Sequence, residues 1–495
     1  MKKFILFFIL GIGFINISCS DTFLDRYPKG TWNISNYKSN DSIKLSVLAT
    51  AEVQQTYASL RNWSFAWDAL GMENYTTPDA YKGGGSASDG GSDIAQFSSL
   101  TYTSQNLVIT DFYGACFASI YLANQSNALI TTMSDTVKSK NSLLAQSLTL
   151  RSLMYFRLAQ AFGGVPWVNI VLAQNAQTPP QVSRDVILGH IISDLTWAIP
   201  YLPSKQQIVS TGNWGNITQN GARAILTKVY LLQQNWASAL AQTQAIIGSG
   251  DNDLTTPYDE IYWESKEFGP ESVLEVYCDV QPATKISIGS QWGEIVAFRG
   301  SPNYGWGFDV PTDSLIAAYE TGDPRKAATV LTKNEVVNGI TFKNAGYEPY
   351  GNGKFVPQAS ETTAFGRGNI QSDQWQNIRL IRYADVILMD AEAANELGQT
   401  QEALDKLEMV RARARAGNIL VLPKITETDQ TKLRAIIHKE RRIELATEWG
   451  RFYDLVRWGE AKNIPGFVVG KHELFPIPQT EIDKSNGSIV QNPGY

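Results

Sequence analysis

The sequence predicts a mostly α-helical protein in which helical hairpins of the tetratricopeptide type form a scaffold around a loop-rich region. Apolar residues recur at i, i+3, i+4 and i+7 within 384–391, which is the spacing of one helix face. After a break at Gly398, a second periodic stretch occupies 403–414. The same arrangement occurs at 222–229 and 237–241. Small residues on both members of each pair allow close antiparallel packing, which favours repeated helical hairpins.

The two helical parts flank a region of different composition. Further helices are expected at about 45–60, 111–133, 141–162, 184–200 and 429–449. Residues 251–378 are instead rich in Gly, Pro, Tyr, Trp and Asn, with a few short strand-like pieces. We therefore expect residues 19–495 to form one globular unit, with the helical scaffold at about 40–250 and 379–460. Because loops on a rigid scaffold often carry binding sites, region 251–378 is the expected ligand-binding part.

The N-terminus has the features of a secretory signal. Two lysines precede an apolar run at 4–15, which is too short to span a bilayer. Ser18 and Cys19 follow where cleavage is expected, and this pair resembles a bacterial lipoprotein site. Asn16 departs from the usual aliphatic residue, so an ordinary signal peptide is the alternative. We expect residues 1–18 to be removed and Cys19 to carry the lipid anchor.

Composition and charge exclude some classes of function. The chain has 495 residues, 43% of them hydrophobic and 18% charged, as in a globular protein. Its net charge is -6 and no basic stripe occurs, so a nucleic-acid partner is not expected. Cys116 and Cys278 have apolar neighbours and are interpreted as buried free thiols, although a disulfide between them is chemically possible outside the cytoplasm.

Catalytic motifs are poorly represented. No His-Glu-x-x-His or Cys-x-x-Cys pattern occurs, so a zinc site has no support. The three histidines are isolated from any nucleophile motif: His190, His438 and His472. A glycosidase needs two carboxylates at a set separation, and a chain with 48 Asp and Glu residues gives no specific pair. Glu440, Glu444 and Glu448 share a helix face among arginines, which indicates a structural ion-pair network.

One glycine-rich segment contains residue types found in ion and phosphate sites. Tyr81 and Lys82 precede three glycines, but the Gly-Lys-Ser/Thr ending of a phosphate loop is missing, which favours a flexible loop. Asp79, Asp89 and Asp93 flank this segment. A structural calcium ion there is conceivable because calcium prefers oxygen ligands, although the spacing is not that of an EF-hand. No cofactor is otherwise expected.

Aromatic residues are the main candidates for ligand binding. The chain has 13 Trp, 21 Tyr and 20 Phe, and ring faces can stack on sugars while amide and guanidinium groups bind hydroxyls. Trp63 and Trp67 share one helix face, where a core position is the more common outcome. The candidate ligand-binding residues are Trp67, Asp79, Tyr81, Trp292, Arg299, Asn303, Tyr304, Trp306, Tyr347, Arg367 and Trp375.

Several blocks of sequence, in order along the chain, resemble the SusD/RagB family of outer-membrane nutrient-binding lipoproteins of Bacteroidetes. The blocks run from the Cys19-Ser-Asp-Thr-Phe-Leu start through Arg151-Ser-Leu-Met-Tyr-Phe, Gly305-Trp-Gly-Phe, Arg382-Tyr-Ala-Asp, Glu440-Arg-Arg-Ile-Glu-Leu, Arg451-Phe-Tyr-Asp and Phe475-Pro-Ile-Pro to Gln491-Asn-Pro-Gly-Tyr. The Thr447–Gly450 segment departs from the usual pattern, in which an alanine and an aromatic residue precede Glu-Gly.

The resemblance implies a function as well as a fold. Members of this family bind oligosaccharides without cleaving them and cover a TonB-dependent, SusC-like barrel in the outer membrane. The implied protein is a surface glycan-binding lipoprotein and not an enzyme. A glycoside hydrolase and a ligand-free helical scaffold are the alternatives. Because the family's glycan site varies, no motif assigns the site here, and Trp306 can be structural since it lies inside a family block.

Overall fold

The computed structural model describes residues 42–173, 176–281, 286–299, 305–337, 340–343, 346–358, 360–361 and 374–495. The scaffold helices are α1 (Ser42–Ser59), α3 (Leu107–Thr131), α4 (Lys140–Phe162), α5 (Arg184–Ala198), α7 (Gln219–Leu232), α8 (Trp236–Ser249), α13 (Tyr383–Glu396), α14 (Thr400–Arg415) and α15 (Gln430–Glu444). The mostly helical fold expected from the sequence is confirmed, although the helix predicted at 429–449 ends at Glu444.

The two hairpins with the clearest sequence periodicity have similar turns. Gln234 between α7 and α8 and Gly398 between α13 and α14 both adopt a left-handed backbone, with φ of 56° and 72°. In the first turn, the Asn235 side chain then accepts a hydrogen bond from the backbone N–H of Ser238 and caps α8. The left-handed residue reverses the chain within a few residues, so each pair packs antiparallel.

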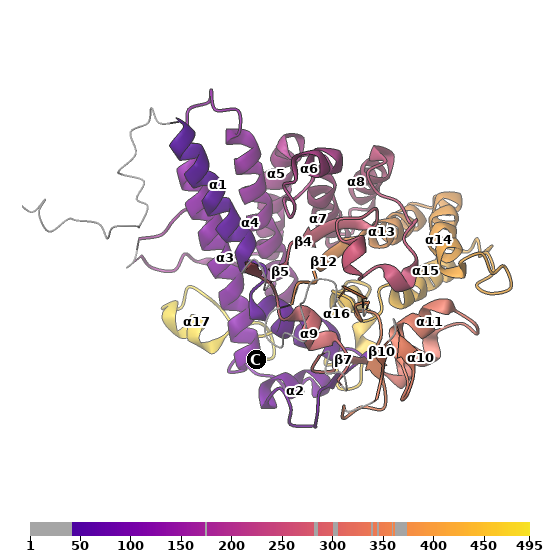
Figure 1. The fold of residues 1–495 in the computed structure, drawn as a ribbon. Coiled ribbons are helices and arrows are strands. Elements are labelled where there is room, and N and C mark those ends of the chain that lie inside the picture. The colour runs from indigo at the N-terminus through magenta and orange to yellow at the C-terminus, as the bar shows by residue number, and fades with distance from the viewer. Residues whose placement is uncertain are drawn as a thin grey trace, which may run out of the picture.

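The helices follow one another through space in chain order. α1 packs on α3, α3 on α4, α4 on α5 and α5 on α7, while α8 contacts both α7 and α13, and α13 contacts α14 and α15 (Figure 1). Helix α3 is long and apolar enough to span a bilayer, but 56% of its apolar stretch is buried inside the protein. This burial is typical of a core helix.

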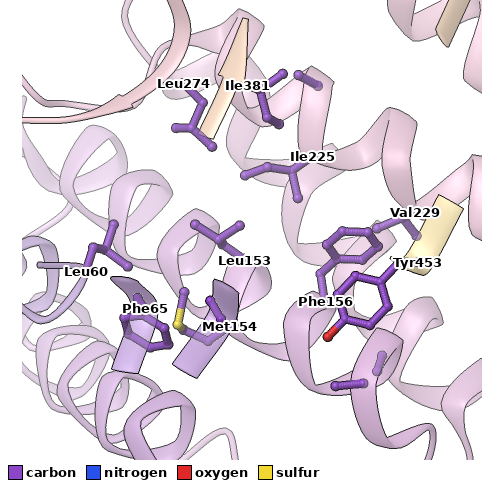
Figure 2. Close-up of a cluster of buried hydrophobic side chains, with 14 of the residues drawn as sticks. Leu60, Phe65, Leu153, Met154, Phe156, Ile225, Val229, Leu274, Ile381 and Tyr453 are labelled. Carbon is purple, nitrogen blue, oxygen red and sulfur yellow. The ribbon is translucent and has the colours of Figure 1, made fainter. Parts of the chain in front are cut away.

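A shared hydrophobic core joins the early and late parts of the chain. Leu153 and Phe156 on α4 lie near Ile225 on α7, and the close-up also shows Leu274 and Ile381 from two paired strands (Figure 2). The buried cluster extends from Leu45 to Ile489. Burial of each large apolar side chain contributes about 1.5–3 kcal/mol, so this core positions the loops that the scaffold carries.

The strands are short and antiparallel. They pair as β1 (Ala80–Gly83) with β7 (Phe308–Pro311), β4 (Ser272–Val276) with β12 (Ile378–Arg382), β5 (Asp279–Gln281) with β6 (Ile286–Ile288), β2 (Val165–Pro166) with β3 (Gln181–Val182), β8 (Val330–Leu331) with β11 (Gly351–Asn352), and β9 (Val336–Val337) with β10 (Ile340–Thr341). Between 251 and 378 the chain also forms the short helices α9 (Trp292–Val296), α10 (Asp313–Ala318) and α11 (Pro324–Thr329). The β1–β7 pair ties this region to the N-terminal part of the chain.

A buried ion-pair network lies beneath the C-terminal helices. Arg382 donates to Glu271 at 2.7 Å, to Glu444 at 2.6 Å and to Glu448 at 2.8 Å. Arg325 bonds to Glu444 and also to Glu440 at 2.6 Å. The prediction of a structural network for these glutamates is confirmed, but the arginines that bind them come from other elements and not from their own helix.

The remaining polar predictions concern histidine and cysteine. His438 stacks on Trp458, with ring centroids 3.6 Å apart, and its Nδ1 lies 2.7 Å from Glu460. Cys116 and Cys278 are both buried, as expected, and are not joined in a disulfide. Burial raises the pKa of the Cys116 thiol to about 12, so it stays protonated and unreactive at neutral pH.

Candidate functional site

An open cavity of about 390 Å³ lies where the N-terminal helices meet the loop-rich region. Its lining combines aromatic rings with a single ion pair: Trp63, Trp67, Asp89, Gly90, Arg299, Trp306 and Phe308. These residues come from parts of the chain more than 200 positions apart, so only the fold brings them together. The combination of ring faces with a few polar groups is typical of a small-molecule or sugar site.

Trp63 and Trp67 are placed by a short π-helix, η3 (Ser64–Asp68), which follows α1. Their rings stack with centroids 5.5 Å apart and planes inclined by 28°. Trp67 is 5% exposed and packs edge-on against Phe308, whereas 38% of Trp63 is exposed. The inner ring is therefore fixed in the core and supports the outer ring, whose surface is open to a ligand.

Trp306 lies beside Trp63 in the lining of the cavity and is anchored by its backbone. Its N–H donates to the carbonyl of Glu294 on α9 at 2.8 Å, and the next residue, Gly307, donates to Ala297 at 2.9 Å. A Cβ on Gly305 would lie 2.5 Å from both of these acceptor oxygens, so a glycine is required there. The Trp306 ring lies 5.8 Å from Trp63 at an inclination of 51°.

Arg299 and Asp89 supply the polar part of the cavity. The Arg299 guanidinium lies 2.9 Å from Asp89 and remains 38% exposed. Asp89 also accepts from the backbone N–H of Gly85 at 2.7 Å, which fixes the carboxylate. Lys82 Nζ donates to the carbonyl of Asp89 at 2.5 Å. The cavity thus offers one guanidinium and one carboxylate whose charges offset each other.

The glycine-rich segment is packed and does not form the free loop that was predicted. It begins in strand β1, and Gly83 and Gly84 have φ of 78° and 88°. A Cβ on Gly84 would lie 2.6 Å from the Phe308 ring, and one on Gly85 would lie 2.7 Å from the Arg299 guanidinium. The glycines are needed because the backbone passes directly behind the cavity.

Three buried carboxyl groups lie behind the aromatic wall. Burial raises the pKa of Asp68 and of Glu294 to about 7, and that of Asp309 to about 8. Asp309 accepts from Asn74 at 3.2 Å, and hydrogen bonds to Ser64 and to Trp306 lower the pKa of Asp68 and Glu294 respectively. All three are at most 1% exposed, so they are protein-facing groups and not ligand contacts.

The structure brings together three of the candidates from the sequence. Trp67, Arg299 and Trp306 all line the cavity. Tyr347 is 58% exposed, and its N–H donates at 2.8 Å to the carbonyl of Gly84, next to the residues that support the cavity. These four residues remain candidates for ligand contact.

Three other candidates occupy structural positions, which corrects the expectation that they face a ligand. Trp292 is 1% exposed and packs on Phe355, with ring centroids 4.6 Å apart, and Trp375 is 3% exposed. Asp79 is buried between Arg442 and Arg451. In these three residues the ring or the charge is used inside the protein. Tyr81 lies in β1, is half-buried and is not among the residues that line this cavity, so its role stays a prediction.

The possible calcium site is not supported by the arrangement of its three carboxylates. Asp79 binds two arginines, Asp89 binds Arg299, and Asp93 accepts from the Leu107 N–H at 3.2 Å. Within the described ranges, no group of three His, Cys, Asp or Glu side chains converges on one point. The other candidates, Cys19, Asn303, Tyr304 and Arg367, lie outside the described residues.

Sequence reasoning missed Trp63 and Phe308 as members of the site. The helical spacing favours a core position for both Trp63 and Trp67, and of the two only Trp67 is a predicted candidate, because equal spacing on a helix does not reveal which ring lies outermost. The signal that could separate them is the position of Trp63 after α1, where the exposed Asn62 already marks the surface. Phe308 lies in a short strand, and its role depends on the pairing of β7 with β1.

Comparisons with known proteins agree with this fold. A family profile described as "SusD family" matches residues 283–467, and another described as "Starch-binding associating with outer membrane" matches residues 35–231. The chain belongs to the SusD/RagB family. Among curated SusD-like relatives, one from Formosa agariphila is 24% identical over the full length of both chains. Another from Bacteroides ovatus is 26% identical over 89% of this chain and 80% of its own.

Solved structures of SusD-like proteins share the same architecture. A laminarin-binding SusD-like protein aligns with a TM-score of 0.74 and 28% identity, covering 91% of this chain and 99% of its own. A SusD-like carbohydrate-binding protein from Bacteroides fragilis aligns with a TM-score of 0.76 and 21% identity, over 90% of this chain and 99% of its own. The second likeness, at that identity, concerns the fold alone.

Proposed function

We propose that this SusD-like protein is a lipid-anchored protein of the outer membrane that binds a glycan at the Trp63–Trp306 cavity and passes it to a TonB-dependent, SusC-like transporter. The observation that carries the proposal is the open cavity whose lining includes the adjacent rings of Trp63 and Trp306 together with Arg299. Sugar rings present apolar faces to aromatic side chains, while a guanidinium and a carboxylate bind hydroxyl groups. The laminarin binding named for one structural relative supports a polysaccharide as the cargo.

The charges of the cavity favour an uncharged glycan. Arg299 is neutralised by Asp89, and these are the charged side chains among the described residues that line the cavity. An anionic sugar would have to compete with Asp89 for the guanidinium. A neutral sugar can instead accept from Arg299 and donate to Asp89 without breaking the pair.

The carboxyl groups support binding without cleavage. A glycosidase places two carboxyl groups on opposite sides of the glycosidic bond. Asp89 is the carboxylate among the described lining residues, and it is held by Arg299 and by the Gly85 N–H. The groups with raised pKa, Asp68, Glu294 and Asp309, are buried behind the rings, where a glycosidic oxygen does not reach them. We therefore propose that the protein is not an enzyme.

Calorimetry tests the binding function. The mature chain with Cys19→Ser, which removes the expected lipid site, is titrated with a panel of soluble neutral and anionic glycans. We expect millimolar to micromolar affinity for a neutral glycan, about -4 to -8 kcal/mol, as suits a capture step followed by release. Absence of binding to every glycan in the panel would contradict the proposal. Sugar fragments released during the titration would support the hydrolase alternative.

The anchor and the transporter need separate tests. In the native host, the wild-type protein should fractionate with the outer membrane, and Cys19→Ser should release it into a soluble fraction. Detergent extraction of the wild-type membrane should co-purify a barrel of the SusC-like class. Recovery of the protein alone would contradict the transporter partnership but leave glycan binding intact.

A further inference from the structure

The side chain of Lys82 extends from strand β1 into the loop that follows it, residues 84–91. Its Nζ donates hydrogen bonds to three backbone carbonyls, which are those of Gly83 at 3.2 Å, Ser86 at 3.4 Å and Asp89 at 2.5 Å. An ammonium group has three donors, so these contacts use all of them. The ammonium also lies 5.6 Å from the centroid of the Phe308 ring, which lines the cavity. It therefore joins the start, the middle and the end of the 84–91 loop.

The composition of this loop makes polar contacts the main source of its order. Residues 85–88 are Gly-Ser-Ala-Ser, and all four are exposed. Gly84, Gly90 and Gly91 have φ of 88°, 80° and 90°, and glycine loses much conformational freedom when it is fixed. Small, exposed residues bury little apolar surface, so hydrophobic packing contributes little to the position of the loop. The hydrogen bonds of the Lys82 ammonium supply what packing does not.

The 84–91 loop contributes two residues to the lining of the cavity, Asp89 and Gly90. The Asp89 carboxylate accepts from Arg299 Nη1 at 2.9 Å, and the same nitrogen lies 3.4 Å from the carbonyl oxygen of Trp306. A Cβ on Gly90 would lie 2.6 Å from the Trp67 ring, so the loop backbone rests against this ring. Displacement of the loop would therefore separate Asp89 from Arg299 and change the shape of the cavity beside Trp67.

We propose that Lys82 is a positioning residue of the cavity, and that its ammonium fixes the 84–91 loop so that Asp89 and Gly90 are in place before a glycan binds. This inference rests on the glycan-binding function proposed above. Order that exists before binding lowers the entropic cost of binding. Lys82 acts through the loop and not by contact with the sugar, because backbone carbonyls use its three donors and it is not among the described lining residues.

Hydrogen–deuterium exchange of the free protein tests the positioning without a ligand. In the wild type the Gly85 N–H donates to the Asp89 carboxylate at 2.7 Å, and the Asp89 N–H donates to the Ser86 carbonyl at 3.1 Å. Lys82→Ala should expose these amides, so the peptide covering residues 84–91 should exchange about tenfold faster, as expected when hydrogen bonds to a charged group are lost.

Chemical rescue separates the hydrogen bonds of the ammonium from other effects of the substitution. Lys82→Ala removes three carbons and the ammonium, which are the atoms of propylammonium, so adding this ion should restore slow exchange. Tetramethylammonium at the same concentration is the control, because it carries the same charge but has no N–H to donate. Lys484→Ala is the matched variant: Lys484 ends α17 (Gln479–Lys484), its side chain is 67% exposed, and exchange of the 84–91 loop should be unchanged.

Glycan affinity provides the functional measurement. Lys82→Ala should bind the glycan about tenfold more weakly than the wild type, because the loop displaces Gly90 as well as Asp89. Propylammonium should recover the affinity, and Lys484→Ala should bind as the wild type does. Lys82→Met should bind as weakly as Lys82→Ala but should not respond to propylammonium, because its side chain fills the space that the ion needs.

Three results would overturn the proposal. The first is an unchanged exchange rate of the loop in Lys82→Ala. The second is a loss of affinity without faster exchange, which would show that Lys82 contacts the sugar directly. The third is rescue by tetramethylammonium equal to that by propylammonium, which would assign the effect to charge alone.

The same measurements separate failure of this inference from failure of the proposed function. If Lys82→Ala does not fold, Lys82→Met retains most of the side-chain packing and its loop should still exchange faster than that of the wild type. If the wild type binds no glycan but the loop responds to Lys82→Ala and to propylammonium, the proposed function fails while the positioning by Lys82 stands.

Discussion

Buried ionisable groups have opposite surroundings in two regions of the molecule, the ion-pair network beneath the C-terminal helices and the cavity at Trp63. In the network, Arg382 and Glu444 are almost completely buried and each has several charged partners. Behind the cavity, Glu294 and Asp309 are equally buried but have mainly neutral partners. The arginines lower the pKa of Glu444, whereas burial raises that of Glu294 to about 7 and that of Asp309 to about 8.

This difference shows which part of the molecule is fixed and which can respond. A charge with several buried partners is costly to break, so the network holds the scaffold in one arrangement. A carboxyl group whose pKa lies near neutrality changes its charge with small changes in its surroundings, such as the arrival of a ligand. The aromatic rings that face solvent in the cavity lie in front of carboxyl groups of this second kind, whose pKa is near neutrality.

The largest effect is expected from breaking the network. Arg382→Met removes a cation that three glutamates share, which leaves buried negative charge and should lower the free energy of unfolding by about 3–5 kcal/mol. Urea denaturation monitored by circular dichroism measures it. Arg434→Met is the control, because Arg434 pairs with Glu396 at the surface and is 35% exposed, so a loss below about 1 kcal/mol is expected. Equal losses of unfolding free energy in the two variants would contradict the expected difference between the buried network and a surface ion pair.

A smaller effect, on binding and not on stability, is expected at the cavity. Trp63→Ala should weaken glycan binding by about 2 kcal/mol, roughly thirtyfold, since an exposed tryptophan in a ligand site often contributes this much. Trp197→Ala is a matched control: Trp197 on α5 is also 38% exposed but lies outside the cavity lining. Calorimetry should show unchanged affinity for the control. A similar loss of affinity in both variants would contradict the assignment of glycan binding to the cavity and not to the surface around Trp197.

The pH dependence of stability should separate the two regions. Asp309 keeps its proton in the folded protein up to about pH 8, whereas its ordinary pKa is 3.8. Its contribution to stability is therefore complete below pH 3.8 and is lost as pH rises through about 8. Asp309→Asn should raise the free energy of unfolding at about pH 9 by about 1–2 kcal/mol relative to wild type.

The paired carboxylates should show the reverse pattern. Arginines lower the pKa of Glu444 and Asp454, so their stabilising contribution is present above the ordinary pKa values and is lost as pH falls below about 4. Denaturant titrations at a series of pH values measure both effects. If Asp309→Asn were no more stable than wild type at alkaline pH, the interpretation that burial keeps the carboxyl groups behind the cavity protonated would be wrong.

The smallest effect is expected from the ion pair inside the cavity. Asp89→Asn removes a partner of Arg299. Both side chains are largely accessible to water, since 38% of the Arg299 side chain and 34% of the Asp89 side chain are exposed. A change in affinity below about 1 kcal/mol is expected. Asp135→Asn, in the exposed pair with Lys140, is a control that should leave binding unchanged. A tenfold or larger loss in Asp89→Asn would show that the carboxylate binds the sugar directly and strongly.

The sequence predicted the scaffold well because helix periodicity is a local property. The hairpins at α7–α8 and α13–α14 appear at the expected positions, with the chain reversing at Gln234 in the first and at the predicted break, Gly398, in the second. The glutamates of α15 were correctly interpreted as structural, but their arginines could not be assigned because they come from α14, β12 and α11. Pairing across the fold is not encoded in local spacing.

The candidate site was predicted only in part for the same reason. Arg299 and Trp306 reach the cavity, whereas Trp292 lies seven residues before Arg299 and is buried against Phe355. Composition marks a loop region as suitable for binding, but it does not say which ring faces inward. Trp63 is the opposite case. It lies in a helical stretch, where a buried ring is expected, but its ring is exposed and lines the cavity because α1 ends just before it.

A crystal structure of the mature protein with a bound oligosaccharide tests the central claim most directly. The claim is that the aromatic cavity, and not another surface, is the glycan site. We expect a sugar ring in contact with Trp63 and Trp306, with a hydroxyl group within hydrogen-bonding distance of Arg299. A sugar bound at another surface, with this cavity empty under the same conditions, would contradict it.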